Sequence, residues 1–408
     1  MVSINKNSRI DIREADVLIT GLQSWDIPIG SNCKNLAREM AQERRVLYVN
    51  PPLDRISVLR KREPEVLQRY RQAWNGGIDN PIEVSDNLWV YYPTAIVESI
   101  SRLPVNHLFD WLNKQNNQRL ARTIQTAIKK LGFGPFWHFC DSDMFRSFYL
   151  KELLNPMHYV YYTRDNLMAV PFWQVQGTRV EPLHMAKADS VAANSLYLAK
   201  LAGRYNPHSY FVGQGCDLTA FRPEATGPAP DDIAAIPGPI IGYIGSLKTL
   251  RLDLNILLYI AEQRTDWHLV LVGPEDDAFR NSRLHQLDNV HFLGRKPESE
   301  LANYLQAFQV AINPQRLNEV TRGNYPRKID EYLAMGKATV ATRTDAMAYF
   351  ADHVSLAQGH EEWVEAIARE LATDTTEKQR ARMAFAAGHT WAQNVENLFD
   401  SIEKSRAL

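Results

Sequence analysis

The chain has 408 residues, of which 45% are hydrophobic and 23% are charged, as in an ordinary soluble globular protein of two or more domains. Its 46 lysines and arginines are balanced by 47 aspartates and glutamates, so the overall charge does not select nucleic acid as a partner. There is no apolar leader and no run of about 18 apolar residues, and Cys33, Cys140 and Cys216 show no metal or disulfide spacing. We therefore expect a cytoplasmic protein.

Short apolar runs alternate with helical patterns along the chain, which predicts an α/β fold with parallel sheets. The first half has an expected helix at 32–43 and expected strands at 16–20, 46–50, 136–140, 158–163, 190–195 and 209–213. Residues 222–239 are rich in proline, alanine and glycine, which predicts a linker. After it, helices are expected near 253–264, 277–287 and 298–306, and strands at 240–245, 268–273, 290–294, 308–313 and 354–357.

Glycine or a polar residue follows many of these expected strands. The carboxyl ends of parallel strands meet at one edge of a sheet, where ligands bind, and glycine lets the backbone approach a ligand closely. Turn chemistry alone explains most single glycines at such ends, so the repetition is the informative feature. The residues are Gly21, Asn50, Asp141, Asp165, Gly245, Gly273, Gly294 and Asn313.

The segment 324–342, NYPRKIDEYLAMGKATVAT, predicts a helix followed by a buried strand. Pro326 suits the first helical position and Gly336 suits the position just after the helix. Arg327 and Lys328 then fall in the first turn, where the helix dipole favours acids and where each cation costs roughly 0.3–1 kcal/mol. A bound anion would remove this conflict.

Lys328 and Glu331 are neighbours on the predicted helix surface. The simplest interpretation is a solvated ion pair, worth only a few tenths of a kcal/mol. The alternative is a nucleotide site, in which the helix N-terminus and Lys328 hold a phosphate and Glu331 accepts ribose hydroxyls. Thr321 and Arg322, beside a flexible Gly323, add groups suited to phosphate oxygens.

The sequence around this helix resembles the nucleotide-sugar lobe of GT-B glycosyltransferases. The pattern N-x-P-x-K-x-x-E-Y-L-A, here Asn324, Pro326, Lys328 and Glu331, is similar to bacterial polysaccharide-assembly enzymes of the glycosyltransferase group 1, family 4-like type. The resemblance is strong over 240–357. It is looser in the first half and at the last helix, where 22–52, VYYTRDNL (160–167) and 389–403 carry it.

The resemblance implies two Rossmann-like domains facing across a cleft. It implies an acceptor-side domain at 1–217, a nucleotide-sugar-binding domain at 218–385, and a helix at 386–408 that crosses back to the first domain. The implied activity is metal-independent transfer of a hexose from a nucleotide-sugar donor to a saccharide or lipid-linked acceptor, in surface polysaccharide or glycolipid synthesis. The donor is a substrate, so no cofactor is expected.

In the implied donor site, Glu331 matches the acid that holds the ribose, and Lys328 matches the diphosphate cation. Arg251 stands where many relatives have a diphosphate-binding lysine, and Arg295 stands where the nucleotide base usually lies. The sequence departs from many retaining relatives at two positions: Gly323 stands where they have a second glutamate, and Ser246 stands where they have an arginine. The resemblance therefore does not say whether the configuration of the transferred sugar is retained or inverted. The remaining donor-site candidates are Gly245, Ser246, Gly273, Gly294, Thr321, Arg322 and Asn324.

An inverting transfer needs a base that takes the proton of the acceptor hydroxyl. The candidates in order are Asp165, Asp26 and His138. Their ordinary alternatives are a helix cap or turn, an Asx turn and a core histidine, respectively. The acid-x-acid triplet 141–143 resembles a metal motif of the other large transferase fold, but it lies outside the donor lobe, and we expect no metal site.

Residues 55–71 contain six arginines and lysines and two acids, with apolar residues interleaved. This fits binding to an anionic membrane surface, although a solvated surface helix is the simpler interpretation. Two other functions use the same fold features. One is a sugar-nucleotide 2-epimerase, and the other is a nucleotide-sugar-binding protein without catalysis.

Overall fold

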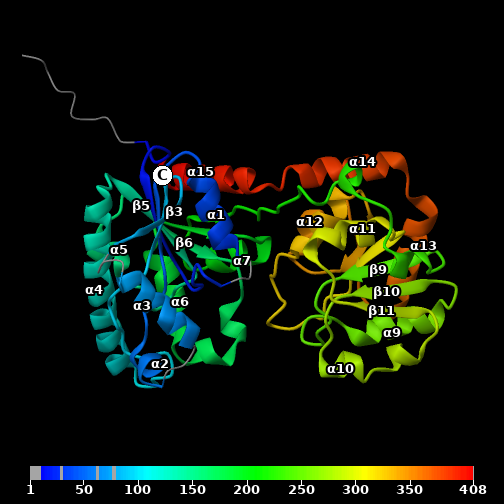
Figure 1. Cartoon of the computed structure of the whole chain (residues 1–408), viewed down its shortest axis with the longest axis horizontal. Coiled ribbons are helices and arrows are strands. Elements are labelled where there is room, and N and C mark those ends of the chain that lie inside the picture. The colour runs from blue at the N-terminus through cyan, green and yellow to red at the C-terminus, as the bar shows by residue number, and fades with distance from the viewer. Residues whose placement is uncertain (1–10, 28–30, 61–63, 76–79, 408) are drawn as a thin grey trace, which may run out of the picture. The chain divides into compact units, whose positions relative to one another are not determined.

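The structure, a computed structural model, describes residues 11–27, 31–60, 64–75 and 80–407. Two α/β units make up the chain (Figure 1). Unit 1 comprises Met1–Gly213 and Asn394–Leu408, and unit 2 comprises Gln214–Gln393. Among the described helices, none combines the length and the apolar character needed to cross a membrane.

Unit 1 is built on an eight-stranded sheet with the order β3-β4-β2-β1-β5-β6-β7-β8. The pairings are parallel except for the β3–β4 hairpin, which is antiparallel. The central strand β1 is buried along its whole length, as expected where helices cover both faces of a parallel sheet. The strands are β1 (Asp16–Gly21), β2 (Val46–Val49), β3 (Ile82–Ser85), β4 (Leu88–Tyr91), β5 (Phe136–Asp141), β6 (Tyr159–Thr163), β7 (Ser190–Ala193) and β8 (Ser209–Phe211).

The longest helix of unit 1 is α4 (Asn106–Leu131), which ends at Gly132 in a left-handed conformation. The last helix of the chain, α15 (Trp391–Ala407), belongs to unit 1 from Asn394 onward. Arg13 anchors it there through three carboxylates along one side of the helix, at 2.6 to 3.0 Å. The other helices of unit 1 are α1 (Asn32–Met40), α2 (Arg55–Leu59), α3 (Pro64–Asn75), α5 (Leu150–Leu154), α6 (Pro171–Lys187) and α7 (Leu196–Ala202).

Unit 2 contains a six-stranded parallel sheet with the order β11-β10-β9-β12-β13-β14. An apolar cluster covers each face, one including Ile329 and Leu333 and the other including Leu257 and Trp363. The strands are β9 (Ile240–Ile244), β10 (His268–Val272), β11 (Val290–Gly294), β12 (Val310–Asn313), β13 (Ala338–Thr342) and β14 (Ser355–Ala357). The helices are α8 (Asp231–Ala234), α9 (Leu254–Gln263), α10 (Asp277–Arg280), α11 (Leu301–Gln306), α12 (Arg327–Ala334), α13 (His360–Thr373) and α14 (Thr376–Ala387).

Three local predictions need correction. The expected helix at 277–287 is only the four-residue α10 followed by a 3₁₀ turn, and the helix at 298–306 begins with a 3₁₀ turn before α11. The segment 222–239 is also not a free linker, because it contains α8 and its Ile233, 1% exposed, packs in the core of unit 2.

Candidate functional site

Helix α12 is held at the carboxyl end of β9 by its own aromatic residue. The Tyr332 hydroxyl accepts a hydrogen bond from the Ile244 N–H at 3.0 Å. Pro326 precedes the helix as its cap residue, one position earlier than predicted, and no side chain caps the free N–H groups. At the other end, Gly336 has φ +68°, as expected for a glycine just beyond a helix.

A cavity of about 370 Å³ lies beside the start of α12, wholly within unit 2. Six of the predicted donor-site residues line it, and its other walls come from the ends of β9 and β12 and from the loop before α12. The six are Gly245, Arg251, Thr321, Asn324, Lys328 and Glu331.

The cations of this cavity are only partly neutralised. Lys328 Nζ lies 3.1 Å from the Tyr243 hydroxyl and 4.8 Å from the centre of its ring. Within the described residues, neither Lys328 nor the exposed Arg251 forms an ion pair. Lining groups of this kind favour an anionic ligand.

Glu331 is paired differently from the prediction. Its Oε1 lies 3.5 Å from Arg327 Nε, so the i,i+4 pair forms and Lys328 is left to the cavity. Burial raises the pKa of Glu331, while the positive charges of Arg327 and Lys328 oppose that rise. Arg327 also lines the cavity, although the sequence favoured only Lys328 of the two.

The two strand-end glycines of β9 and β10 pack against each other. Gly245 has φ +146° and Gly273 has φ +148°, conformations that side-chain-bearing residues rarely adopt. A Cβ on Gly273 would lie 1.8 Å from the carbonyl oxygen of Gly245, and a Cβ on Gly245 would lie 3.2 Å from Lys328 Nζ. Gly273 thus supports the turn at Gly245, which in turn contacts the lysine.

Other predicted donor residues are less directly placed. Asn324 lines the cavity with a buried Oδ1 that has no hydrogen-bond partner, whereas the Thr321 hydroxyl is already bonded to the carbonyl of Arg316. Arg322 pairs with Glu319 at 3.3 Å and does not line the cavity. Ser246, Gly273, Gly294 and Arg295 also lie outside its lining, the last two at the end of the edge strand β11.

The position of the missing second glutamate has a local explanation. Gly323 is buried and has φ +82°, a conformation that would strain any residue with a side chain. Glu319, the nearby acid, is exposed and engaged with Arg322. The turn before α12 therefore requires glycine where many retaining relatives have an acid.

The three candidate bases in unit 1 have different surroundings. Asp165 follows β6, is 45% exposed at its side chain and lies 3.2 Å from Arg164. Asp26 follows β1 and accepts from the Tyr92 hydroxyl with both oxygens at 2.8 Å. His138 is fully buried within β5, out of reach of an acceptor hydroxyl, and desolvation lowers its pKa to about 3, so it is the least suited of the three.

Both acids of the acid-x-acid triplet 141–143 form ion pairs with arginines. Asp141 lies 2.8 Å from Arg164, and Asp143 lies 2.9 Å from Arg146. Both carboxylates are buried, so each arginine compensates a charge that would otherwise be costly.

Comparison with known proteins identifies the part of the chain around the cavity. Residues 238–373 match the family model for Glycosyl transferases group 1. The predicted resemblance is confirmed. The chain is also 30% identical over 166 residues to TuaH of Bacillus subtilis, named as a teichuronic acid biosynthesis glycosyltransferase. That match covers 38% of this chain and 41% of TuaH, so it spans less than half of the relative.

Solved structures confirm the group 1 resemblance at the level of fold. HepE from Anabaena in complex with UDP is 15% identical, with a TM-score of 0.62 over 95% of this chain and 100% of HepE. Sucrose-phosphate synthase from Thermosynechococcus elongatus is 17% identical, with a TM-score of 0.61 over 97% of this chain and 100% of that protein. The predicted α/β architecture of two Rossmann-like domains is therefore confirmed.

Two cavity residues that contact Lys328 or Glu331 were not among the predicted donor-site residues. Tyr243 lies in the middle of an apolar strand, where nothing in the local pattern distinguishes it from a core residue, and the predicted helix surface paired Glu331 with Lys328 and not with Arg327. The i,i+4 spacing of Arg327 and Glu331 was the signal available for the second residue.

Proposed function

We propose that this protein is a glycosyltransferase that moves a sugar from a nucleotide-sugar donor to a saccharide or lipid-linked acceptor. The observation that carries the proposal is the pair of unneutralised cations, Lys328 and Arg251, lining a cavity that also contains Glu331. The group 1 match and the name of TuaH support transfer in surface polysaccharide or glycolipid synthesis. The descriptions of two solved neighbours, which name UDP and UDP-2-fluoro glucose as their ligands, support a nucleotide-sugar donor.

In the proposed donor complex, the diphosphate lies at the start of α12. Lys328 and Arg251 bind its oxygens, with the helix dipole of α12 behind them, whereas the Arg327 and Ile329 N–H groups already donate to the carbonyls of Tyr325 and Pro326 at 3.1 and 2.8 Å. Glu331 accepts hydrogen bonds from the ribose, and the unpartnered Asn324 Oδ1 is available to a hydroxyl or amino donor of the ligand. We propose that the nucleotide base binds near Gly294 and Arg295, at the end of β11.

The reaction follows from this placement. An acceptor hydroxyl oxygen bonds to the anomeric carbon as the bond from that carbon to the diphosphate oxygen breaks, and the nucleoside diphosphate leaves with the electron pair. Fixed cations aimed at the leaving oxygen stabilise the developing charge, by roughly 3–4 kcal/mol for one good donor. In an inverting reaction a carboxylate of unit 1 takes the hydroxyl proton, with Asp165 the first candidate and Asp26 the second. The proposal needs no metal or cofactor.

Donor binding is tested by thermal unfolding with a panel of nucleoside diphosphate sugars. The correct donor at one hundred times its Kd should add about 2.7 kcal/mol of stability. Lys328→Met and Arg251→Gln should each weaken binding about 10- to 100-fold, because each loses a charge-assisted hydrogen bond. Lys378→Met, an exposed lysine of α14 outside the cavity, is the control. Unchanged affinity in both cavity variants would refute the site.

Activity separates transfer from the alternatives. A transferase should release nucleoside diphosphate slowly from the donor alone and faster with an acceptor, and Asp165→Asn should reduce the acceptor-dependent rate without weakening donor binding. A 2-epimerase would change the sugar configuration, and a binding protein would release nothing. The group 1 match and TuaH do not favour these alternatives.

We also propose that the protein works in the cytoplasm and associates peripherally with the inner face of the cell membrane. The basic segment 55–71 supports this, although Arg55 is engaged with Glu98, and Lys61 and Arg62 lie outside the described residues. Leu59, 75% exposed on α2, adds an apolar contact. Flotation with liposomes rich in phosphatidylglycerol is the test, with binding expected at low salt and lost at high salt.

A further inference from the structure

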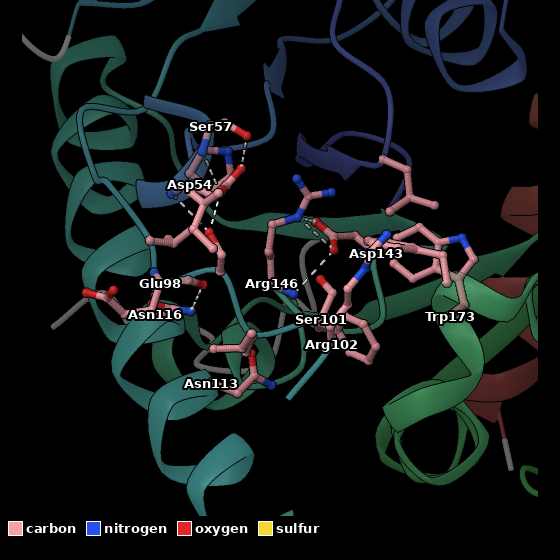
Figure 2. Close-up of a pocket in the computed structure, with 18 of the residues that line it drawn as sticks. Asp54, Ser57, Glu98, Ser101, Arg102, Asn113, Asn116, Asp143, Arg146 and Trp173 are labelled. Carbon is pink, nitrogen blue, oxygen red and sulfur yellow. Dashed lines mark hydrogen bonds and ion pairs between the residues drawn. The ribbon is translucent and has the colours of Figure 1, made fainter. Parts of the chain in front are cut away.

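Unit 1 contains a second cavity, of about 500 Å³, which nothing above assigns to a ligand. Its walls follow the carboxyl ends of β1, β2, β4 and β5 and include the start of α6, so it lies at the edge of the sheet where ligands of parallel α/β folds bind (Figure 2). Its size is in the range of small-molecule sites. The polar residues that line it are Asp54, Ser57, Arg60, Glu98, Ser99, Ser101, Arg102, Asn113, Asn116, Asp143 and Arg146.

The carboxylates on the left of Figure 2 are already neutralised or capped. Asp54 caps α2, accepting from the Ser57 N–H at 3.1 Å and from hydroxyl groups, and these bonds lower its pKa. Glu98 lies 2.7 Å from Arg55 and 3.1 Å from Arg119, neither of which lines the cavity. Glu98 is therefore neutralised by arginines outside the cavity, whereas Asp54 stays ionised, with its oxygens engaged by Ser57 and Ser99.

The arginines that line the cavity are not all neutralised by carboxylates. Arg146 binds Asp143 at 2.9 Å through Nε, which leaves the two terminal nitrogens of its guanidinium outside that pair (Figure 2). Arg102 lies with its guanidinium carbon 5.8 Å from the centre of the Phe172 ring and, among the described residues, forms no ion pair. Arg60 likewise has no carboxylate partner in the described part of the chain. Two unneutralised arginines, beside one capped aspartate and the neutralised Glu98, favour an anionic ligand.

Aromatic rings form the wall next to these arginines. Phe172 and Trp173 open helix α6 with their rings 4.9 Å apart, and Trp173 lies 5.7 Å from Phe145, which also lines the cavity. Aromatic rings offer an apolar face beside the polar side chains, which suits the C–H face of a sugar ring. A ligand that satisfies both walls combines a ring of that kind with a negative charge.

We propose that this cavity binds an anionic saccharide, with its carboxylate or phosphate on Arg102 and Arg146 and its ring against Trp173. The inference rests on the proposed transferase function, in which this saccharide is the acceptor. The charge distribution favours an anionic glycan over a neutral one, because only an anion adds an attraction to the exposed Arg102 and Arg60 guanidinium groups. Asn116 does not contact the ligand in this scheme, since it is bonded to the backbone of Glu98 at 2.8 and 3.0 Å.

The test compares three methyl glycosides that share one ring: methyl glucoside, methyl glucuronide and methyl glucoside 6-phosphate. Saturation-transfer NMR on the full chain measures their affinities. The anionic glycosides should bind at least about tenfold more tightly than the neutral one, and the advantage should shrink as salt rises. The two anionic probes distinguish carboxylate from phosphate recognition. Equal binding of all three would overturn the proposal.

Substitutions in the cavity identify the residues that bind the glycosides. Arg102→Gln should remove about tenfold of the affinity for an anionic glycoside and leave the neutral one unchanged. Trp173→Leu should weaken all of them. Arg122→Gln and Trp111→Leu, both on the exposed side of α4 and outside the cavity, are the controls. If Arg102→Gln fails to fold, Arg60→Gln tests the same charge, and an effect no larger than that of Arg122→Gln would overturn the assignment.

A nucleotide titration keeps this proposal separate from the donor site. Each unit 1 variant should bind the nucleoside diphosphate like the wild type, because its substitution lies outside unit 2. Loss of glycoside binding with intact nucleotide binding supports the saccharide site. A wild-type protein that binds the glycosides but no nucleotide would refute the proposed transferase and leave only an anionic-saccharide site.

Discussion

The two glycines Gly273 and Gly359 give a sharp test of how the donor site is built. Both lie in unit 2 and both have positive φ, +148° and +88°, but Gly359 precedes α13 and does not line the donor cavity. A methyl group on Gly359 would meet nothing within 4 Å, whereas one on Gly273 would lie 1.8 Å from the Gly245 carbonyl oxygen. Since contacts below about 3 Å are not tolerated, Gly273→Ala must move the Gly245 turn, and Gly359→Ala need not move anything.

The energies follow from these geometries. Gly359→Ala should cost about 1–3 kcal/mol, because its φ of +88° and ψ of 160° form a conformation that is almost restricted to glycine. Gly273→Ala should cost about 1–3 kcal/mol for the strain of a conformation that is almost restricted to glycine. The overlap with the Gly245 carbonyl should cost about 1–3 kcal/mol more. Because Gly245 lies against Lys328, the shift should also displace the lysine and weaken nucleotide binding about tenfold or more.

The assay combines chemical unfolding with calorimetric titration of the nucleotide found in the donor screen. Gly359→Ala serves as the matched control, since it carries the same substitution and a positive-φ strain but no clash, and it lies outside the donor cavity. Nucleotide affinity should fall only in Gly273→Ala. If both variants bound the nucleotide as the wild type does and lost similar stability, the inferred support of Gly245 by Gly273 would be wrong.

Two further predictions concern buried acids. Burial raises the pKa of Glu181 from 4.5 to about 7, against a hydrogen bond of 3.0 Å from Tyr161. Between pH 4.5 and 7 the Glu181 carboxyl is therefore protonated in the folded state and ionised in the unfolded state, so the free energy of unfolding should fall by about 3 kcal/mol as pH rises across that range. Unfolding titrations at several pH values measure this loss. Glu181→Gln should abolish it, and Glu65→Gln should not. His389→Ala removes a 2.6 Å partner of the fully buried Asp330 and should cost about 1–3 kcal/mol, because the buried acid loses that hydrogen bond. Chemical unfolding measures the cost, and a loss no larger than that of the exposed His360→Ala would contradict the argument.

The strands and the donor helix could be predicted because their signals are local. An apolar run ending in glycine specifies a buried parallel strand, as β9 and β10 show. The start and end of α12 were predicted to within a residue or two from Pro326 and Gly336. These features depend on neighbouring residues only, so the sequence alone was sufficient.

Helix α4 shows why other parts could not be predicted. Its inner side carries Asn113, Asn116 and Asn117, all buried, which breaks the apolar periodicity that identifies a helix. Asn116 and Asn117 find partners distant in sequence: the Asn117 amide, for example, donates to the Phe145 carbonyl at 3.0 Å. Only the folded structure supplies such partners, and for the same reason the cavity beside Arg102 and Trp173 left no recognisable pattern in the sequence.

The cationic start of α12 also gains a clearer explanation than the sequence allowed. Arg327 and Glu331 form a pair at 3.5 Å, longer than the 2.6–2.9 Å of well-formed pairs such as Arg45 with Asp16 at 2.7 Å. Such a loose pair contributes about 0–1 kcal/mol, so Glu331 can exchange Arg327 for the hydroxyls of a ribose at little cost. Lys328 needs no exchange, because among the described residues it donates to the Tyr243 hydroxyl and forms no ion pair. In the proposed complex the diphosphate would therefore supply an anion for Lys328. The ribose would replace Arg327 as the partner of Glu331, and Arg327 could then bind the outer diphosphate oxygens.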